Sequence, residues 1–138
     1  MAFKLNAGKV KTIWMPVTAS TAIAEGALVT KSSGLLIAAT STTAENAVVG
    51  VLGKTIAATD ADFATSARLV PVLVPMEPYT LWEFDVTSGL VIADCDNEVD
   101  LTDSVTVNRA GTTYKIVRPT QVISTTKGIG LVKFFGSF

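Results

Sequence analysis

The chain has 138 residues, a formal net charge of −1 and no histidine. The lack of histidine excludes Ser-His-Asp and Cys-His catalytic sites and removes the commonest general base and metal ligand. The 11 Lys and Arg residues form no basic run, so the sequence lacks the concentrated positive face that nucleic acid binding needs.

The composition indicates one domain that expects a partner. Charged residues make up 17% of the chain, against about 25% in an ordinary soluble protein, and the mean hydropathy is +0.46. A chain of this kind buries much of its exterior against copies of itself or against another protein. The single cysteine, Cys95, cannot form an internal disulfide, which indicates a reducing compartment or an assembly held together by other means.

Residues 1–18 predict an amino-terminal arm. Its large apolar side chains stay ordered only if something covers them, which favours a docking role. Residues 12–24, TIWMPVTASTAIA, overlap this arm and end in an Ala22-x-Ala24 pattern resembling a signal-peptidase site. Polar residues and a proline interrupt the apolar centre of that stretch, so secretion is disfavoured. No window approaches the roughly 18 consecutive apolar residues of a membrane helix.

The next segment, GALVTKSSGLLIAA at residues 26–39, predicts a β-hairpin with Gly34 in its turn. Leu28 and Val29 are adjacent, so polar alternation fails and each strand should be covered on both faces. We expect one face to pack on the protein's own core and the other on a neighbouring subunit. Gly50 and Gly53, in the strand that follows, indicate a bulge or a close backbone approach.

The rest of the chain reads mainly as strands. Residues 59–67, TDADFATSA, predict a helix of one or two turns. Residues 68–86 predict two strands, the first at a sheet edge or with a bulge because Pro71 cannot donate a hydrogen bond. Two hairpins follow, with turns at residues 108–111 and near 127–128. We therefore predict an all-β barrel or sandwich with at most one or two short helices, in which residues 19–138 form one domain whose two lobes meet near 87–94.

Acidic side chains recur at every second position of DCDNEVDLTD, residues 94–103. Oxygen ligands at this spacing resemble a calcium loop, but the glycine and the final glutamate of an EF-hand are replaced by Val99 and Val105. An exposed loop is the favoured interpretation and a bound cation the alternative. Cys95 lies between two aspartates, whose charge disfavours a nucleophilic thiolate. We predict no catalytic residue, no cofactor and no metal site.

Residues 25–58, EGALVTKSSGLLIAATSTTAENAVVGVLGKTIAA, resemble the small head decoration, or cement, proteins of tailed bacteriophages, including the group around the lambda head decoration protein. The shared scheme is a short apolar strand, a serine-containing turn, a second strand, a threonine-rich loop and Ala-Val-Val-Gly-Val-Leu, in that order. LWEFDV at 81–86, DLTDSVTVN at 100–108 and TTKGIGLVKF at 125–134 look similar to the carboxyl-terminal parts of other phage capsid accessory proteins. The chain has a longer carboxyl-terminal segment than the smallest members.

The resemblance implies a virion structural protein, made in the host cytoplasm, that binds the outside of the expanded capsid, often as a trimer. Its partner would be the major capsid protein, whose neighbouring subunits it fastens. We expect the arm to add a strand to a capsid subunit. The residues predicted to make this contact are Phe3, Leu5, Val10, Ile13 and Trp14. The alternative is a virion-displayed carbohydrate-binding or host-adhesion module with Trp14 or Tyr79 as its stacking surface; a secreted hydrolase is disfavoured.

Overall fold

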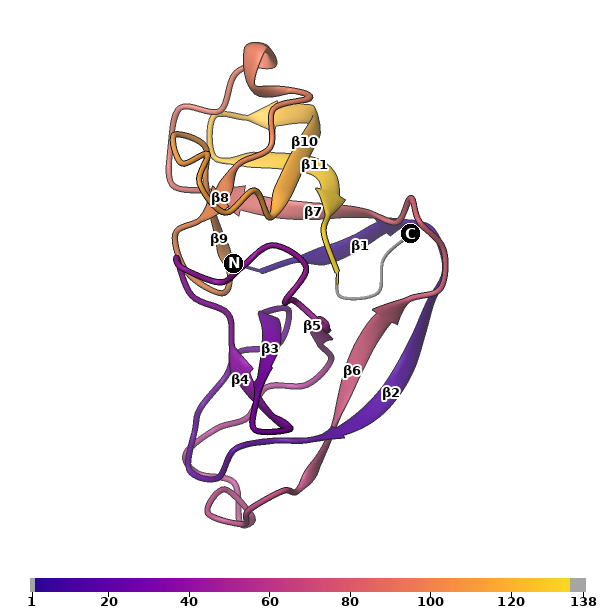
Figure 1. Ribbon diagram of the computed structural model, residues 1–138, viewed down its shortest axis with the longest axis vertical. Helices are drawn as coiled ribbons and strands as arrows, with labels where there is room; N and C mark the ends of the chain where they lie inside the picture. Colours follow the sequence, from indigo (N-terminus) through magenta and orange to yellow (C-terminus); the bar gives the residue numbers. More distant parts are fainter. Residues whose placement is uncertain (1, 135–138) are drawn as a thin grey trace.

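The computed structural model describes residues 2–134, which form β-strands and one short 3-10 turn, η1, but no α-helix (Figure 1). None of these residues lies in a helix long and apolar enough to span a membrane. The prediction of an all-β fold is confirmed: two sheets of short, mostly antiparallel strands make a sandwich-like structure. The elements are β1 (Lys4–Ala7), β2 (Val10–Pro16), β3 (Leu28–Ser32), β4 (Leu35–Ala38), β5 (Gly50–Leu52), β6 (Leu69–Pro75), β7 (Leu81–Val86), η1 (Ile92–Asp94), β8 (Asp100–Leu101), β9 (Thr106–Asn108), β10 (Val117–Ser124) and β11 (Lys127–Val132).

The upper sheet of Figure 1 has the strand order β10-β11-β7-β9-β8, with β1 also paired to β7. Its central strand β7 alternates strictly, because Trp82, Phe84 and Val86 are buried and the residues between them are half-buried. The ring of Trp82 lies 5.9 Å from that of Phe134, and the ring of Phe84 lies 6.2 Å from that of Phe3, measured between centroids. These aromatic contacts form the centre of the larger hydrophobic cluster.

The lower sheet has the order β2-β6-β5-β3-β4. The predicted hairpin is confirmed as β3 and β4, which are joined through Ser33 and Gly34 with φ angles of 51° and 83°. Two consecutive positive φ angles are typical of a type I′ turn. The close approach predicted at Gly50 is also confirmed, since a Cβ there would lie 2.5 Å from Cγ1 of Val72.

Both faces of the first part of β3 are covered by the chain itself. Leu28 and Val29 are each fully buried, at 0% exposed. Leu28 belongs to the cluster around Trp82, whereas Val29 belongs to a second cluster that includes Leu36. Because strand side chains alternate between faces, adjacent residues reach the two clusters. The expectation that a neighbouring subunit covers the second face is therefore wrong at this position.

The helix predicted at residues 59–67 is also wrong. This segment is a series of turns, in which the N–H groups of Asp60, Phe63 and Thr65 each donate to the carbonyl three residues earlier. The Asp60 carboxylate turns back to accept the Ala57 N–H at 3.1 Å. Such a local side-chain bond competes with helix formation, and the segment has one large apolar residue, Phe63, which is too few for a helical packing face.

The strand with Pro71 is not at an edge, contrary to the prediction. This strand, β6, lies between β2 and β5 and pairs with β2 without a register shift. The Pro71 carbonyl accepts the Gly53 N–H at 2.9 Å, so the Pro71 nitrogen also faces the β5 side. There β5 ends at Leu52, so the missing N–H costs only the reciprocal bond to Gly53, beyond the last residue of β5.

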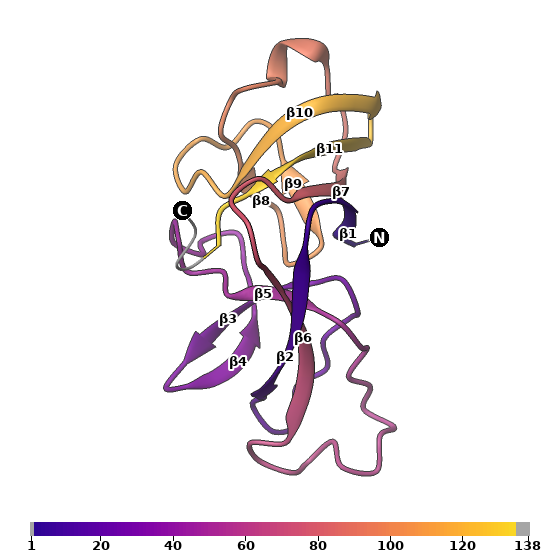
Figure 2. The same cartoon turned by 90° about the vertical axis from the view of Figure 1, so that its right-hand side faces the viewer.

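The segment predicted as an arm is part of both sheets. β1 pairs with β7 in the upper sheet, and β2 pairs with β6 in the lower sheet. The chain passes between the sheets at residues 8–9 and again at 76–80, whereas residues 87–94 follow β7 and include η1. Figure 2 shows β2 and β6 side by side as a ribbon that descends from the upper sheet.

Candidate docking site

The five residues predicted to contact a capsid fall into two groups. Phe3 is 3% exposed, donates its N–H to the Gly26 carbonyl at 2.9 Å and packs in the larger cluster. Leu5 lies opposite Trp82, and both Leu5 and Val10 pack against the same cluster. These three side chains support the fold. Of the five predicted contact residues, only Ile13 and Trp14 are exposed at the surface.

Ile13 and Trp14 are exposed in the middle of β2. The exposed fractions are 38% for Ile13 and 59% for Trp14. Residues directly opposite each other in an antiparallel pair share one face of the sheet. Ile13 lies opposite the buried Val72 and Trp14 opposite Pro71, so the two side chains are on different faces. Leu69, two residues before Pro71, is 61% exposed on the Trp14 face.

β2 is an edge strand whose unpaired backbone groups can be assigned. Met76 donates to the Lys9 carbonyl, and Val17 donates to the Arg68 carbonyl. In this register, hydrogen-bonded pairs alternate, so the odd-numbered residues of β2 bond to β6. The N–H and C=O groups of Val10, Thr12 and Trp14 therefore point away from β6, along the free edge.

The prolines of the ribbon agree with this assignment. The three prolines all occupy non-hydrogen-bonded pairs of the β2–β6 ladder; they are Pro16, Pro71 and Pro75. A proline is tolerated there because its missing N–H would not join the β2–β6 ladder. Beyond Pro16, Val17 forms a bridge with Leu36 of β4, which limits the free edge to the first part of β2.

A pocket of about 220 Å³ lies beside Trp14 on the outer face of the ribbon. Leu69, Val70 and Pro71 of β6 and the loop before β6 form its wall with Trp14. Residues from that loop that line it include Lys54, Thr55, Ile56, Asp60, Asp62 and Arg68.

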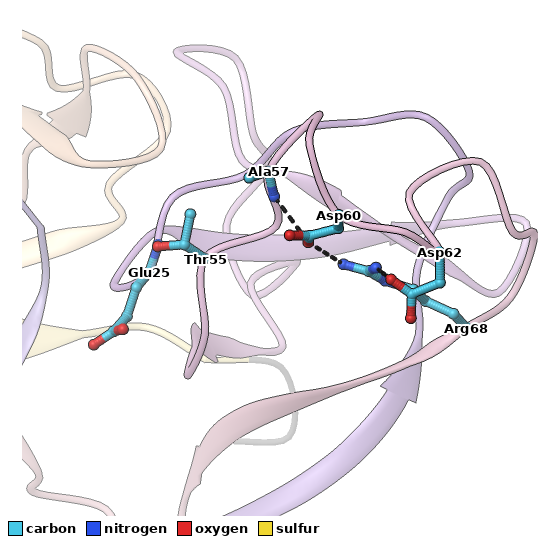
Figure 3. Close-up of polar contacts among 6 residues, drawn as sticks. All are labelled: Glu25, Thr55, Ala57, Asp60, Asp62 and Arg68. Atoms are coloured by element: carbon cyan, nitrogen blue, oxygen red, sulfur yellow. Dashed lines mark hydrogen bonds and ion pairs between the residues drawn. The ribbon is translucent and has the colours of Figure 1, made fainter.

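An ion-pair clasp fixes this loop (Figure 3). The Arg68 guanidinium donates to Asp60 at 3.1 Å and to Asp62, and its side chain is 11% exposed. The Ala57 N–H, followed by Arg68, holds the pKa of Asp60 below its ordinary value. The Glu25 N–H donates to the Thr55 hydroxyl at 3.1 Å. The polar rim of the pocket is therefore held by bonds within the chain.

The acidic run at residues 94–103 does not gather its carboxylates into one site. Arg109 binds Asp94 at 2.7 and 3.0 Å, and Lys133 binds Glu98 at 3.0 Å. Asp100 is 6% exposed and accepts the N–H groups of Thr113, Tyr114 and Lys115 at 2.7–3.1 Å. Within residues 2–134, no group of three His, Cys, Asp or Glu side chains is arranged to hold a metal ion. The half-buried Cys95 is a free thiol.

Asp94 provides a test of these contacts. The hydrogen-bonded Arg109 guanidinium holds the pKa of Asp94 below its ordinary value, against the opposing effect of burial. Its stabilising effect is then present above the unfolded value, about pH 3.9, and is lost as the pH falls through the lower folded value. We expect Asp94→Asn to reduce the free energy of unfolding by about 1–2 kcal/mol at pH 7. Urea titrations should show this difference shrinking below pH 4; an equal difference at pH 7 and pH 2.5 would contradict it.

The sequence reasoning missed the clasp and Leu69. Asp60 and Asp62 fall within the helix predicted at residues 59–67, and no sequence pattern paired either residue with Arg68. The spacing of Pro71 and Pro75, four residues apart in one strand, was a usable signal because it places both prolines in the same ladder phase. Both prolines therefore lack an N–H on the same edge of β6, the edge that faces away from β2.

The chain is an all-β, sandwich-like protein in which the edge strand β2 lies beside a small, polar-rimmed pocket. In comparisons with known proteins, no family model and no curated protein matches the chain.

Proposed function

We propose that this protein is a virion structural protein that binds the outer surface of the expanded capsid of a tailed bacteriophage and stabilises contacts between major capsid subunits. The resemblance of residues 25–58 to head decoration proteins supplies the identity of the partner. The observation that carries the proposal is the free edge of β2, where Ile13 and Trp14 are exposed within the segment predicted to make the contact.

Strand addition is the docking mechanism that this edge supports. Outward N–H and C=O groups at Val10, Thr12 and Trp14 have the spacing that an extended chain pairs with. Side chains of the added strand would cover Ile13 on one face of the sheet and Trp14 on the other. Apolar burial contributes about 25 cal/mol per Å², and several copies held by one lattice gain further through avidity. We infer a homo-oligomer, a trimer by the resemblance, and no nucleic acid or membrane partner.

Co-sedimentation with undecorated capsids of the cognate phage tests this function. We expect saturable binding to expanded shells and none to compact procapsids, because a decoration protein recognises the subunit arrangement of the mature lattice. The plateau gives the number of copies per capsid. Absence of binding to both forms would contradict the proposal.

A further inference from the structure

We propose that the pocket beside Trp14 is a saccharide-binding site, in which one neutral sugar ring stacks on the Trp14 indole and its hydroxyls bond to Asp60, Asp62 and Lys54. This inference goes beyond capsid docking and does not rest on it. Docking pairs the backbone edge of β2 and also contacts Trp14, whereas the saccharide site is the pocket on the outer face of the ribbon, so the two share this one side chain.

The aromatic platform is the first support. Trp14 is 59% exposed, while the other tryptophan, Trp82, is fully buried. The strand holds the Trp14 backbone in register with Pro71, so the side chain projects from a fixed point of the sheet. An indole combines a large apolar face with a polar N–H, and a sugar ring likewise combines an apolar C–H face with hydroxyls at its rim.

The polar rim is the second support. Arg68 donates to both Asp60 and Asp62, and the Ala57 N–H fixes Asp60 further (Figure 3). These bonds use Oδ2 of Asp60 and Oδ1 of Asp62. The other two oxygens, Oδ1 of Asp60 and Oδ2 of Asp62, accept no hydrogen bond from any residue in the range 2–134. The two remaining oxygens are available as acceptors for the hydroxyl groups of a ligand.

Charge and size then select the ligand. Lys54 and Arg68 balance the charges of Asp60 and Asp62, so the lining favours a neutral ligand that both donates and accepts hydrogen bonds. The pocket volume, about 220 Å³, is below the roughly 300–1,000 Å³ of sites for drug-sized molecules. A single sugar ring fits these limits. An apolar side chain of a partner protein would desolvate the rim without replacing its hydrogen bonds.

A glycan array followed by tryptophan fluorescence tests this inference with the full chain. The array presents neutral and N-acetylated glycans, and the best-retained sugar is then titrated as the free saccharide. We expect a saturable change in emission, because Trp14 is exposed to the ligand and Trp82 is not. Trp14→Ala should abolish retention, and Asp62→Asn should weaken binding by about tenfold.

Ile92→Ala is the control, since Ile92 is an apolar side chain that is 82% exposed and does not line the pocket. Its binding should equal that of the unaltered chain, and near-ultraviolet circular dichroism should show that the Trp14→Ala protein remains folded. Retention of no glycan would overturn the inference, as would binding that Trp14→Ala leaves unchanged. Loss of capsid binding in Trp14→Ala, without glycan binding by the unaltered chain, would show that Trp14 contacts protein and would overturn the saccharide site alone.

Discussion

Replacing Thr12 by proline should strongly weaken capsid binding while the protein stays folded. The Thr12 N–H points away from β6, so its loss removes no ladder bond within the sheet. Pro16, four residues further along the same strand, already occupies a position of this phase. On the capsid side, the same change removes a donor from the middle of the free edge and places a pyrrolidine ring in the path of an added strand. We expect capsid affinity to fall at least tenfold, with stability within about 1 kcal/mol of the unaltered chain.

Two neighbouring variants make this result specific. Thr12→Ala keeps the backbone N–H and should bind expanded capsids normally. Ile13→Pro removes an N–H that faces β6 and should destabilise the protein by about 3 kcal/mol. Co-sedimentation and thermal unfolding of the three variants measure both effects. Unchanged capsid binding by folded Thr12→Pro would rule out strand addition at β2.

Local signals predicted most of the lower hairpin. Gly34 and the serine before it predicted the turn, and the apolar residues on either side predicted the two strands, of which β3 is buried on both faces at Leu28 and Val29. What covers the second face depends on residues far away in the chain: Leu28 reaches the cluster of Trp82, which lies in the upper sheet. Sequence periodicity reports that a face is buried but does not identify its partner.

The candidate site was predicted in part for the same reason. Phe3 and Trp14 are both aromatic residues near the amino terminus, and the sequence alone treats them alike. Phe3 is buried because Gly26 and Phe84 meet it from distant segments, whereas no described residue covers Trp14 to that extent. The acidic run behaves similarly. Its spacing resembled a cation loop, but Arg109 and Lys133 reach it from later strands and loops.

Asp100 is the residue of this run whose loss should cost the most stability. Its Oδ1 accepts the N–H groups of Tyr114 and Lys115 at 2.7 and 2.8 Å, and its Oδ2 accepts that of Thr113 at 3.1 Å. Lys115 has a φ of 58°, a backbone conformation that these bonds help to hold. Asp100→Ala removes the acceptor of all three donors at a site 6% exposed. We expect the free energy of unfolding to fall by about 3 kcal/mol, measured by urea denaturation.

Two further variants separate the contribution of the Asp100 hydrogen bonds to stability from the contribution of its charge. Asp100→Asn retains one oxygen, which can accept from Tyr114 and Lys115, and should lose about 1–2 kcal/mol. Asp96→Asn neutralises a nearby carboxylate that is 75% exposed and 3.6 Å from Arg118. Asparagine tolerates the positive φ of this residue, 72°, so the change should alter stability by less than about 0.5 kcal/mol. If Asp100→Ala and Asp96→Asn cost the same, the loop of residues 111–115 would not depend on Asp100. The expected order instead follows from burial, because water can replace an exposed carboxylate but reaches the three enclosed N–H groups poorly.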